Sequence, residues 1–94
     1  MSIRINAEKS QPSGMTAMTV VVEGDQAAEL TSLNVRNEVL KFARSAGFPA
    51  RGLGGIPNPY PVDQEGKTDD DLILGRRPID HWEAVYAVSS GLGV

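Results

Sequence analysis

The sequence predicts a small α+β domain in which one amphipathic helix packs on a sheet of antiparallel strands. Three observations carry this prediction. A run of β-branched residues in the first quarter of the chain is typical of a buried strand, a helical stripe of apolar residues follows it, and an aromatic segment near the C-terminus alternates as a further strand would. The expected order is β-β-α-loop-β in a single domain spanning 1–94, because 94 residues support one core.

The first two strands are predicted from alternation and composition. Apolar and polar residues alternate over 2–7, which indicates a short, half-buried strand. Proline and glycine predict a turn over 11–14. A second strand is expected over 15–23, where the three consecutive valines of 20–22 indicate burial on both faces of the sheet. The short connection favours an antiparallel pair.

The clearest predicted element is a helix over 26–46. Gly47 ends it, because glycine readily adopts the left-handed conformation found after helix ends. A shorter helix is the alternative, since Thr31, Ser32 and Asn34 all carry side chains that cap helix N-termini. The apolar residues of the stripe follow at spacings of four, three and four, with one earlier alanine in phase: Val35, Val39, Phe42, Ala46 and Ala28.

A segment without periodicity, residues 47–71, follows the helix. It is rich in glycine and proline at first and acidic later, and a loop of this length in a small domain is expected to be functional or mobile. Residues 79–88 then fit two patterns. Asp80 and Glu83 have the spacing of a helical capping box, whereas the alternating large side chains from Trp82 onward predict a strand. The strand is favoured because the valines leave a helix no polar face.

Composition limits the classes of function. The chain has no cysteine, so disulfides and thiolate metal sites do not supplement its small core, and homo-oligomerisation is expected to bury further surface. No apolar run approaches the roughly 20 residues that cross a bilayer. The charged N-terminus differs from a secretory signal, so a cytoplasmic protein is expected. A net charge of −3 argues against a nucleic-acid backbone as partner.

Catalytic and metal-binding constellations are not expected, and no cofactor is predicted. His81 is the only histidine, which leaves a transition-metal site without other nitrogen or sulfur donors. As a general base His81 would need a nucleophile such as Ser89 or Ser90 and an orienting carboxylate, Asp80 or Glu83. Neighbouring residues on a strand point to opposite faces, which places Asp80 and His81 apart. We therefore expect a protein without enzymatic activity.

The glycines after the helix offer one alternative site. Gly52, Gly54 and Gly55 begin as a dinucleotide fingerprint begins, but Pro57 occupies the position of the third glycine. They also follow a helix, whereas the fingerprint follows a strand and opens a helix. Together with Arg51, the three glycines remain a candidate anion-binding site formed by backbone amides.

Aromatic and arginine residues indicate the expected contact surface. Tyr60 and Asn58 in the proline-rich segment, with Arg76 and Arg77, are the residues predicted to bind a protein partner, since Tyr and Arg often carry interface energy. The function expected is that of a small non-catalytic binding protein, an inhibitor or adaptor, similar in style to short accessory proteins of phages and mobile elements. The alternative is a binder of a nucleotide or other phosphate-bearing molecule, with Arg51 joining Arg76 and Arg77.

Overall fold

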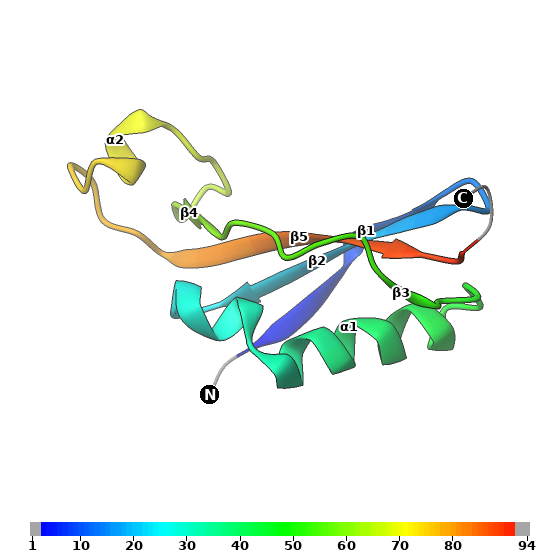
Figure 1. The fold of residues 1–94 in the computed structure, drawn as a ribbon. Coiled ribbons are helices and arrows are strands. Elements are labelled where there is room, and N and C mark those ends of the chain that lie inside the picture. The colour runs from blue at the N-terminus through cyan, green and yellow to red at the C-terminus, as the bar shows by residue number, and fades with distance from the viewer. Residues whose placement is uncertain (1–2, 92–94) are drawn as a thin grey trace.

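The computed structural model describes residues 3–91 and contains one antiparallel sheet with the main helix packed on one face (Figure 1). This confirms the predicted α+β class, with one main helix on antiparallel strands. No helix of this described part is long and apolar enough to cross a membrane. The elements in chain order are β1 (Arg4–Ser13), β2 (Ala17–Gly24), the 3-10 helix η1 (Ala27–Thr31), α1 (Leu33–Ser45), β3 (Gly52–Leu53), β4 (Tyr60–Val62), α2 (Asp70–Ile73) and β5 (His81–Ser89).

The sheet is organised around β5, the last strand. β2 pairs with one side of β5 and β1 pairs with the outer side of β2. Two short strands share the other side of β5, with β4 beside its N-terminal part and β3 beside its C-terminal part. The structure thus decides residues 79–88 in favour of the strand. Its alternate side chains from Trp82 to Val88 pack toward the helices, which no helical arrangement of this segment would achieve.

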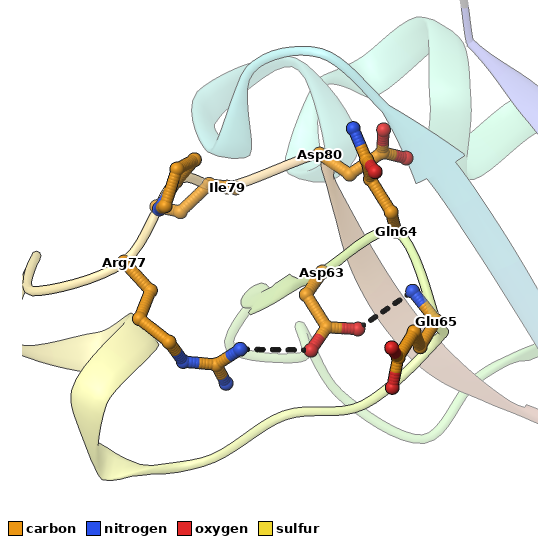
Figure 2. A pocket seen from close by; sticks show the side chains of 7 residues that line it. Asp63, Gln64, Glu65, Arg77, Ile79 and Asp80 are labelled. Atoms are coloured by element: carbon orange, nitrogen blue, oxygen red, sulfur yellow. Dashed lines mark hydrogen bonds and ion pairs between the residues drawn. The ribbon is translucent and has the colours of Figure 1, made fainter.

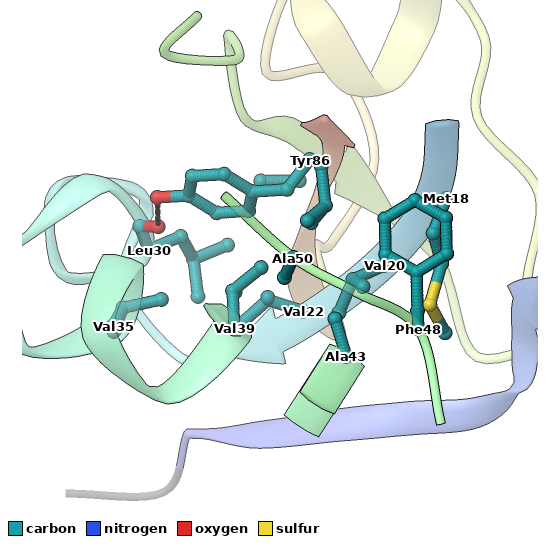
Figure 3. Close-up of a cluster of buried hydrophobic side chains, with 12 residues drawn as sticks. Met18, Val20, Val22, Leu30, Val35, Val39, Ala43, Phe48, Ala50 and Tyr86 are labelled. Atoms are coloured by element: carbon teal, nitrogen blue, oxygen red, sulfur yellow. Dashed lines mark hydrogen bonds between the residues drawn. The ribbon is translucent and has the colours of Figure 1, made fainter. Parts of the chain in front are cut away.

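The hydrophobic core lies between the sheet and the two helices η1 and α1 (Figure 3). Tyr86 of β5 is fully buried, and its hydroxyl donates a 2.6 Å hydrogen bond to the carbonyl oxygen of Leu30. This bond ties η1 to the sheet. The buried members of the core are Met18, Val20, Val22, Leu30, Val35, Val39, Ala43, Phe48, Ala50, Ala84, Tyr86 and Val88.

The helix predicted over 26–46 is wrong in its first part. The chain forms the short η1 there and breaks at Ser32, whose hydroxyl accepts a 3.3 Å hydrogen bond from the N–H of Val35 and caps α1. The shorter alternative is therefore confirmed. Because the break shifts the helical phase, Ala28 is exposed and lies off the apolar stripe. At the other end, Ala46 is exposed because it is the C-cap residue of α1. The buried stripe of α1 is Val35, Val39 and Ala43.

The first strand is longer than the prediction over 2–7, and the turn expected over 11–14 lies later. β1 continues to Ser13, and the reversal follows at Gly14, whose φ of 73° requires the left-handed conformation. Ser2, the first residue of the predicted strand, lies outside the described residues.

A bulge explains the extra length of β1. The pairing with β2 shifts register between Asn6 and Gln11. Within the bulge, the hydroxyl of Ser10 accepts a 3.0 Å hydrogen bond from the N–H of Val21, a donor that a regular strand would pair with a carbonyl. Ser10 is buried as a result. The two residues before Ser10 are thereby lifted out of the regular ladder.

The segment 47–71, predicted as a loop, includes β3 and β4 and the first residues of α2. Residues 63–80, called the excursion below, leave the sheet after β4 and return at the start of β5. Figure 1 shows them extending beyond the end of the sheet, with α2 at their far side. The excursion contributes to an elongated molecule of 43 × 24 × 21 Å.

Replacing Tyr86 by phenylalanine tests how η1 is held. Tyr86→Phe is expected to lower the free energy of unfolding by about 1–3 kcal/mol, because the ring stays packed while the buried Leu30 carbonyl loses its partner. Denaturant unfolding measures this change. Met15→Ala, at a side chain 74% exposed, is the control and should change stability by less than about 0.5 kcal/mol. Equal stability of Tyr86→Phe and wild type would contradict the role given to this bond.

Candidate functional site

Three ionisable side chains meet at the N-terminal end of β5, on the sheet face opposite α1. The sheet register places Glu23 of β2 directly opposite Glu83 of β5. His81 lies two residues before Glu83 and therefore on the same face. The side chains of Glu23, Glu83 and His81 are 7%, 3% and 14% exposed. These three residues, called the ionic cluster below, thus share one largely buried space.

Both ring nitrogens of His81 contact carboxylates. Nδ1 lies 2.8 Å from Asp80 Oδ2, whereas Nε2 lies 3.0 Å from Glu83 Oε2 and 4.0 Å from Glu23 Oε1. Burial lowers the pKa of His81, but the hydrogen bonds to Asp80 and Glu83 and the charges of both glutamates outweigh it and raise the pKa. The predicted separation of Asp80 and His81 is wrong, because Asp80 precedes the strand and its carboxylate meets the ring.

Two residues of β1 hold Glu23. Arg4 Nε lies 2.7 Å from Oε2, and Asn6 Nδ2 donates a 2.8 Å hydrogen bond to Oε1. Asn6 also organises the bulge, because its side-chain oxygen accepts hydrogen bonds from the N–H groups of Glu8 and Lys9 at 3.1 and 3.3 Å. One asparagine therefore fixes both the carboxylate and the loop of chain that carries Lys9.

Glu83 is held from the other side of the cluster. Lys9 Nζ lies 3.2 and 3.1 Å from its two carboxylate oxygens, and the hydroxyl of Tyr60 donates a 3.1 Å hydrogen bond to Oε1. Burial raises the pKa of Glu83, but the hydrogen bonds with His81, Lys9 and Tyr60 outweigh it and lower the pKa. Burial, followed by the charge of Glu83, raises the pKa of Tyr60 to about 12. The glutamate is thus kept ionised and the tyrosine neutral.

The hydroxyls considered as nucleophiles, Ser89 and Ser90, lie at the opposite end of β5 from His81. Eight residues of strand separate Ser89 from His81, which corresponds to about 26 Å. The hydroxyl of Ser90 donates to the carbonyl of Met15 at 2.7 Å. Neither serine can therefore receive a proton-transfer contact from this imidazole within one chain.

Next to the cluster, the excursion is organised by the carboxylate of Asp63 (Figure 2). Its Oδ1 accepts hydrogen bonds from the N–H groups of Glu65 and Lys67 at 2.8 and 2.9 Å, and Arg77 Nη1 donates to Oδ2 at 3.1 Å. The N–H of Lys67 lowers the pKa of Asp63 most, burial raises it, and Arg77 and the N–H of Glu65 lower it further, with a net decrease. A pocket of ≈ 410 Å³ lies here, lined by Asp63, Gln64, Glu65, Arg77, Pro78, Ile79 and Asp80.

A second carboxylate shapes the far side of the excursion. Asp69 caps α2 by accepting the N–H of Leu72 at 3.1 Å and also forms an ion pair with Arg77. Leu72 is 1% exposed and anchors the short helix, whereas the next two residues, Ile73 and Leu74, are each 62% exposed. The excursion therefore presents two large aliphatic side chains on a hydrogen-bonded frame.

The charge of the chain is concentrated in the same region. Residues 63–80 hold six of the 12 carboxylates and three of the nine cationic side chains, which gives −3, the net charge of the whole chain. The remaining residues balance to zero. The exposed aliphatic pair thus sits within the one strongly acidic part of the molecule.

Two of the four residues predicted to bind a partner make hydrogen bonds or ion pairs within the chain. Tyr60 is half-buried and belongs to the surroundings of the ionic cluster, and Arg77 is bound to Asp63 and Asp69. Asn58 is exposed on the segment between β3 and β4. Arg76 is exposed on the excursion, 3.7 Å from the carboxylate of Asp71. Tyr60, predicted to bind a partner from its place in the proline-rich segment, is carried against β5 by β4.

The candidate anion site lies at the other end of β5. The N–H groups of Arg51 and Gly54 donate to the carbonyls of Ser89 and Ala87, each at 2.7 Å, and Gly52 pairs with Ser89 within the sheet. The amides of Arg51 and Gly54 are therefore already hydrogen-bonded to backbone carbonyls. Gly55 adopts a φ of 154°. The arginine pair of the excursion is about one strand length away, so Arg51 does not converge with Arg76 and Arg77 within a single chain.

Sequence reasoning named Asp80 and Glu83 as possible partners of His81 but missed the other residues around it. The two-residue spacing of His81 and Glu83 on a predicted strand was a sufficient signal for those two, since it places both on one face. Glu23, Asn6 and Lys9 carried no such signal, because they meet the histidine only through strand register and a bulge.

Low pH should weaken the hydrogen bonds through which Asp63 organises the excursion. The folded-state pKa of Asp63 lies below its unfolded value, so its contribution to stability is present above the unfolded pKa and is lost as pH falls through the folded one. Asp63→Asn is therefore expected to lower stability most near neutral pH, with the difference from wild type shrinking in acid. Urea unfolding across this pH range measures it.

The control for that experiment breaks a bond in the same turn without removing a charge. The hydroxyl of Thr68 donates to the carbonyl of Pro61 at 2.6 Å, so Thr68→Val should lower stability by a similar amount at every pH. A pH-independent effect of Asp63→Asn would show that its ionisation contributes nothing to the fold.

Comparison of the chain with models of protein families, with curated proteins and with solved structures finds no match.

Proposed function

We propose that this chain is a non-catalytic binding protein that docks on a partner protein through its excursion. The observation that carries the proposal is the exposure of Ile73 and Leu74, at 62% each, directly after the buried anchor Leu72. Adjacent exposed aliphatic side chains that are rigidly held offer apolar surface that a partner can bury.

The frame beneath these side chains supports the proposal. Asp69 caps the short helix, Asp63 closes the preceding turn, and Arg77 bridges the two carboxylates. At the return to the sheet, the N–H of Asp80 donates to the carbonyl of Val62 at 2.9 Å. A surface that is already ordered loses less conformational entropy when it binds, so more of the contact energy is retained as affinity.

The charge of the excursion indicates the chemistry of the partner. Its net −3 favours a protein surface rich in lysine and arginine around an apolar depression that receives Ile73 and Leu74. The same charge disfavours pairing of two copies through this surface, since equal charges repel. The expected homo-oligomer would therefore use another surface, with the excursion left available.

The mode of action that we propose is occlusion or bridging of the partner, as in an inhibitor or an adaptor. Such action needs complementary surface and no reaction. The engagement of both His81 nitrogens by carboxylates, with Ser89 and Ser90 at the far end of the strand, supports a protein that binds without catalysis. The phosphate-binding alternative has less support, because its arginines lie at opposite ends of β5.

Selection from a random peptide library tests the proposal without knowledge of the partner. Peptides that bind the protein are expected to be rich in lysine or arginine with a large apolar residue among them. The double variant Ile73→Ser/Leu74→Ser should bind these peptides at least about tenfold more weakly, because burial of each aliphatic side chain is worth roughly 1.5–3 kcal/mol. Fluorescence anisotropy of a labelled peptide gives the dissociation constants.

The matched control removes equally exposed apolar residues elsewhere. Met15→Ser/Leu33→Ser changes side chains that are 74% and 65% exposed and lie outside the excursion, so peptide affinity should stay within about twofold. Selected peptides that are acidic or neutral, or equal weakening by the two double variants, would reject the excursion as the docking surface. A thermal shift with nucleotides that disappears on replacing Arg51 would favour the small-ligand alternative.

A further inference from the structure

The ionic cluster has the composition and spacing of a metal site. The ligand atoms that Glu23, His81 and Glu83 can offer all lie within 4.8 Å of one another. They come from two paired strands of the sheet rather than from a loop, so their positions are fixed by backbone hydrogen bonds. We propose that these three side chains bind a divalent transition-metal ion of the zinc class, through His81 Nε2 and one oxygen of each glutamate.

The distances require only small movements. Ligand atoms about 2.1 Å from a tetrahedral zinc ion are about 3.4 Å apart. His81 Nε2 is now 3.0 Å from the Glu83 oxygen and 4.0 Å from the Glu23 oxygen. Each of these separations differs from the tetrahedral value by roughly 0.4–0.6 Å. The two glutamate oxygens lie within 4.8 Å of each other, so they have to approach by up to about 1.4 Å. Rotation of the carboxylates can bring the three donors within bonding distance, with a fourth position left for water.

The partners behind the donors are those that metal ligands have. Asp80 bonds Nδ1 of His81, which directs Nε2 toward the two glutamates, and a carboxylate behind a histidine is a common support of zinc ligands. Asn6 and Arg4 hold Glu23, and Tyr60 holds Glu83. All three donors therefore have polar partners that fix their orientation.

Lys9 neutralises part of the charge of the cluster. Its ammonium lies against both oxygens of Glu83, but its side chain is 47% exposed and belongs to the bulge of β1, so it can turn to solvent when a metal ion enters. The donor set favours a transition metal. Imidazole is a typical ligand of zinc and its neighbours, whereas Mg²⁺ and Ca²⁺ prefer oxygen ligands throughout and Cu(I) prefers sulfur.

Calorimetric titration of the purified chain with Zn²⁺ tests the proposal, with Co²⁺ as a spectroscopic probe of four-coordinate geometry. We expect one ion per chain and a visible Co²⁺ absorption typical of tetrahedral sites. His81→Gln and Glu83→Gln should each weaken Zn²⁺ binding at least about tenfold, and Asp80→Asn should weaken it by roughly tenfold to a hundredfold through loss of orientation. Circular dichroism verifies that each variant is folded.

Lys9→Met tests the site without changing a ligand, which matters if the ligand variants fail to fold. Removing the competing ammonium should tighten Zn²⁺ binding, whereas Lys67→Met, which removes an exposed lysine of the excursion, should leave it unchanged. Asp70→Asn removes an exposed carboxylate outside the cluster and should also have no effect. Absence of Zn²⁺ binding at millimolar concentration, unchanged binding in folded His81→Gln, or weaker binding in Lys9→Met would overturn the site.

Discussion

The pairing of β2 with β5 is the constraint on which the other features of this protein depend. On one face, the register brings Val20 and Val22 together with Tyr86 and Ala84 to form the floor of the core. On the other face, the same register places Glu23 opposite Glu83, and like charges directly opposite one another destabilise a sheet. The strand pair that makes the core thus also creates a local excess of negative charge that has to be compensated.

The surrounding elements supply that compensation. β1 contributes a guanidinium, an amide and, through its bulge, an ammonium, while β4 contributes a phenol and the start of β5 an imidazole. Four strands, β1, β2, β4 and β5, are therefore tied together at one end of the sheet. Because a buried charge without a partner is costly, the bulge of β1 and the docking of β4 have an electrostatic reason as well as a geometric one.

The excursion adjoins this cluster, because its last residue, Asp80, contacts His81. Its frame uses its own carboxylates as hydrogen-bond acceptors, with Asp63 and Asp69 joined through Arg77. These carboxylates accept hydrogen bonds within the excursion, and they also make its surface acidic. That combination lets an 18-residue stretch hold Leu72 inside while Ile73 and Leu74 remain outside. The protein thus has a neutral body that carries the core and an acidic extension that carries the exposed aliphatic pair.

The sequence by itself determined the class of fold, the position of the β-branched strand and the end of the helix just before Gly47, and it favoured a strand over a helix for the C-terminal segment. These depend on periodicity and on local conformational preference, which are properties of neighbouring residues. The sequence offered the break at Ser32 only as an alternative. A serine can cap the start of a helix, but it can also occupy a position within a longer helix. Only the tertiary structure decided that Glu23, His81 and Glu83 meet, that Tyr60 turns inward, and that Arg51 lies far from Arg77. Strand register and the path of the long connection set those distances, and both result from contacts between residues remote in sequence, about which local patterns carry no information.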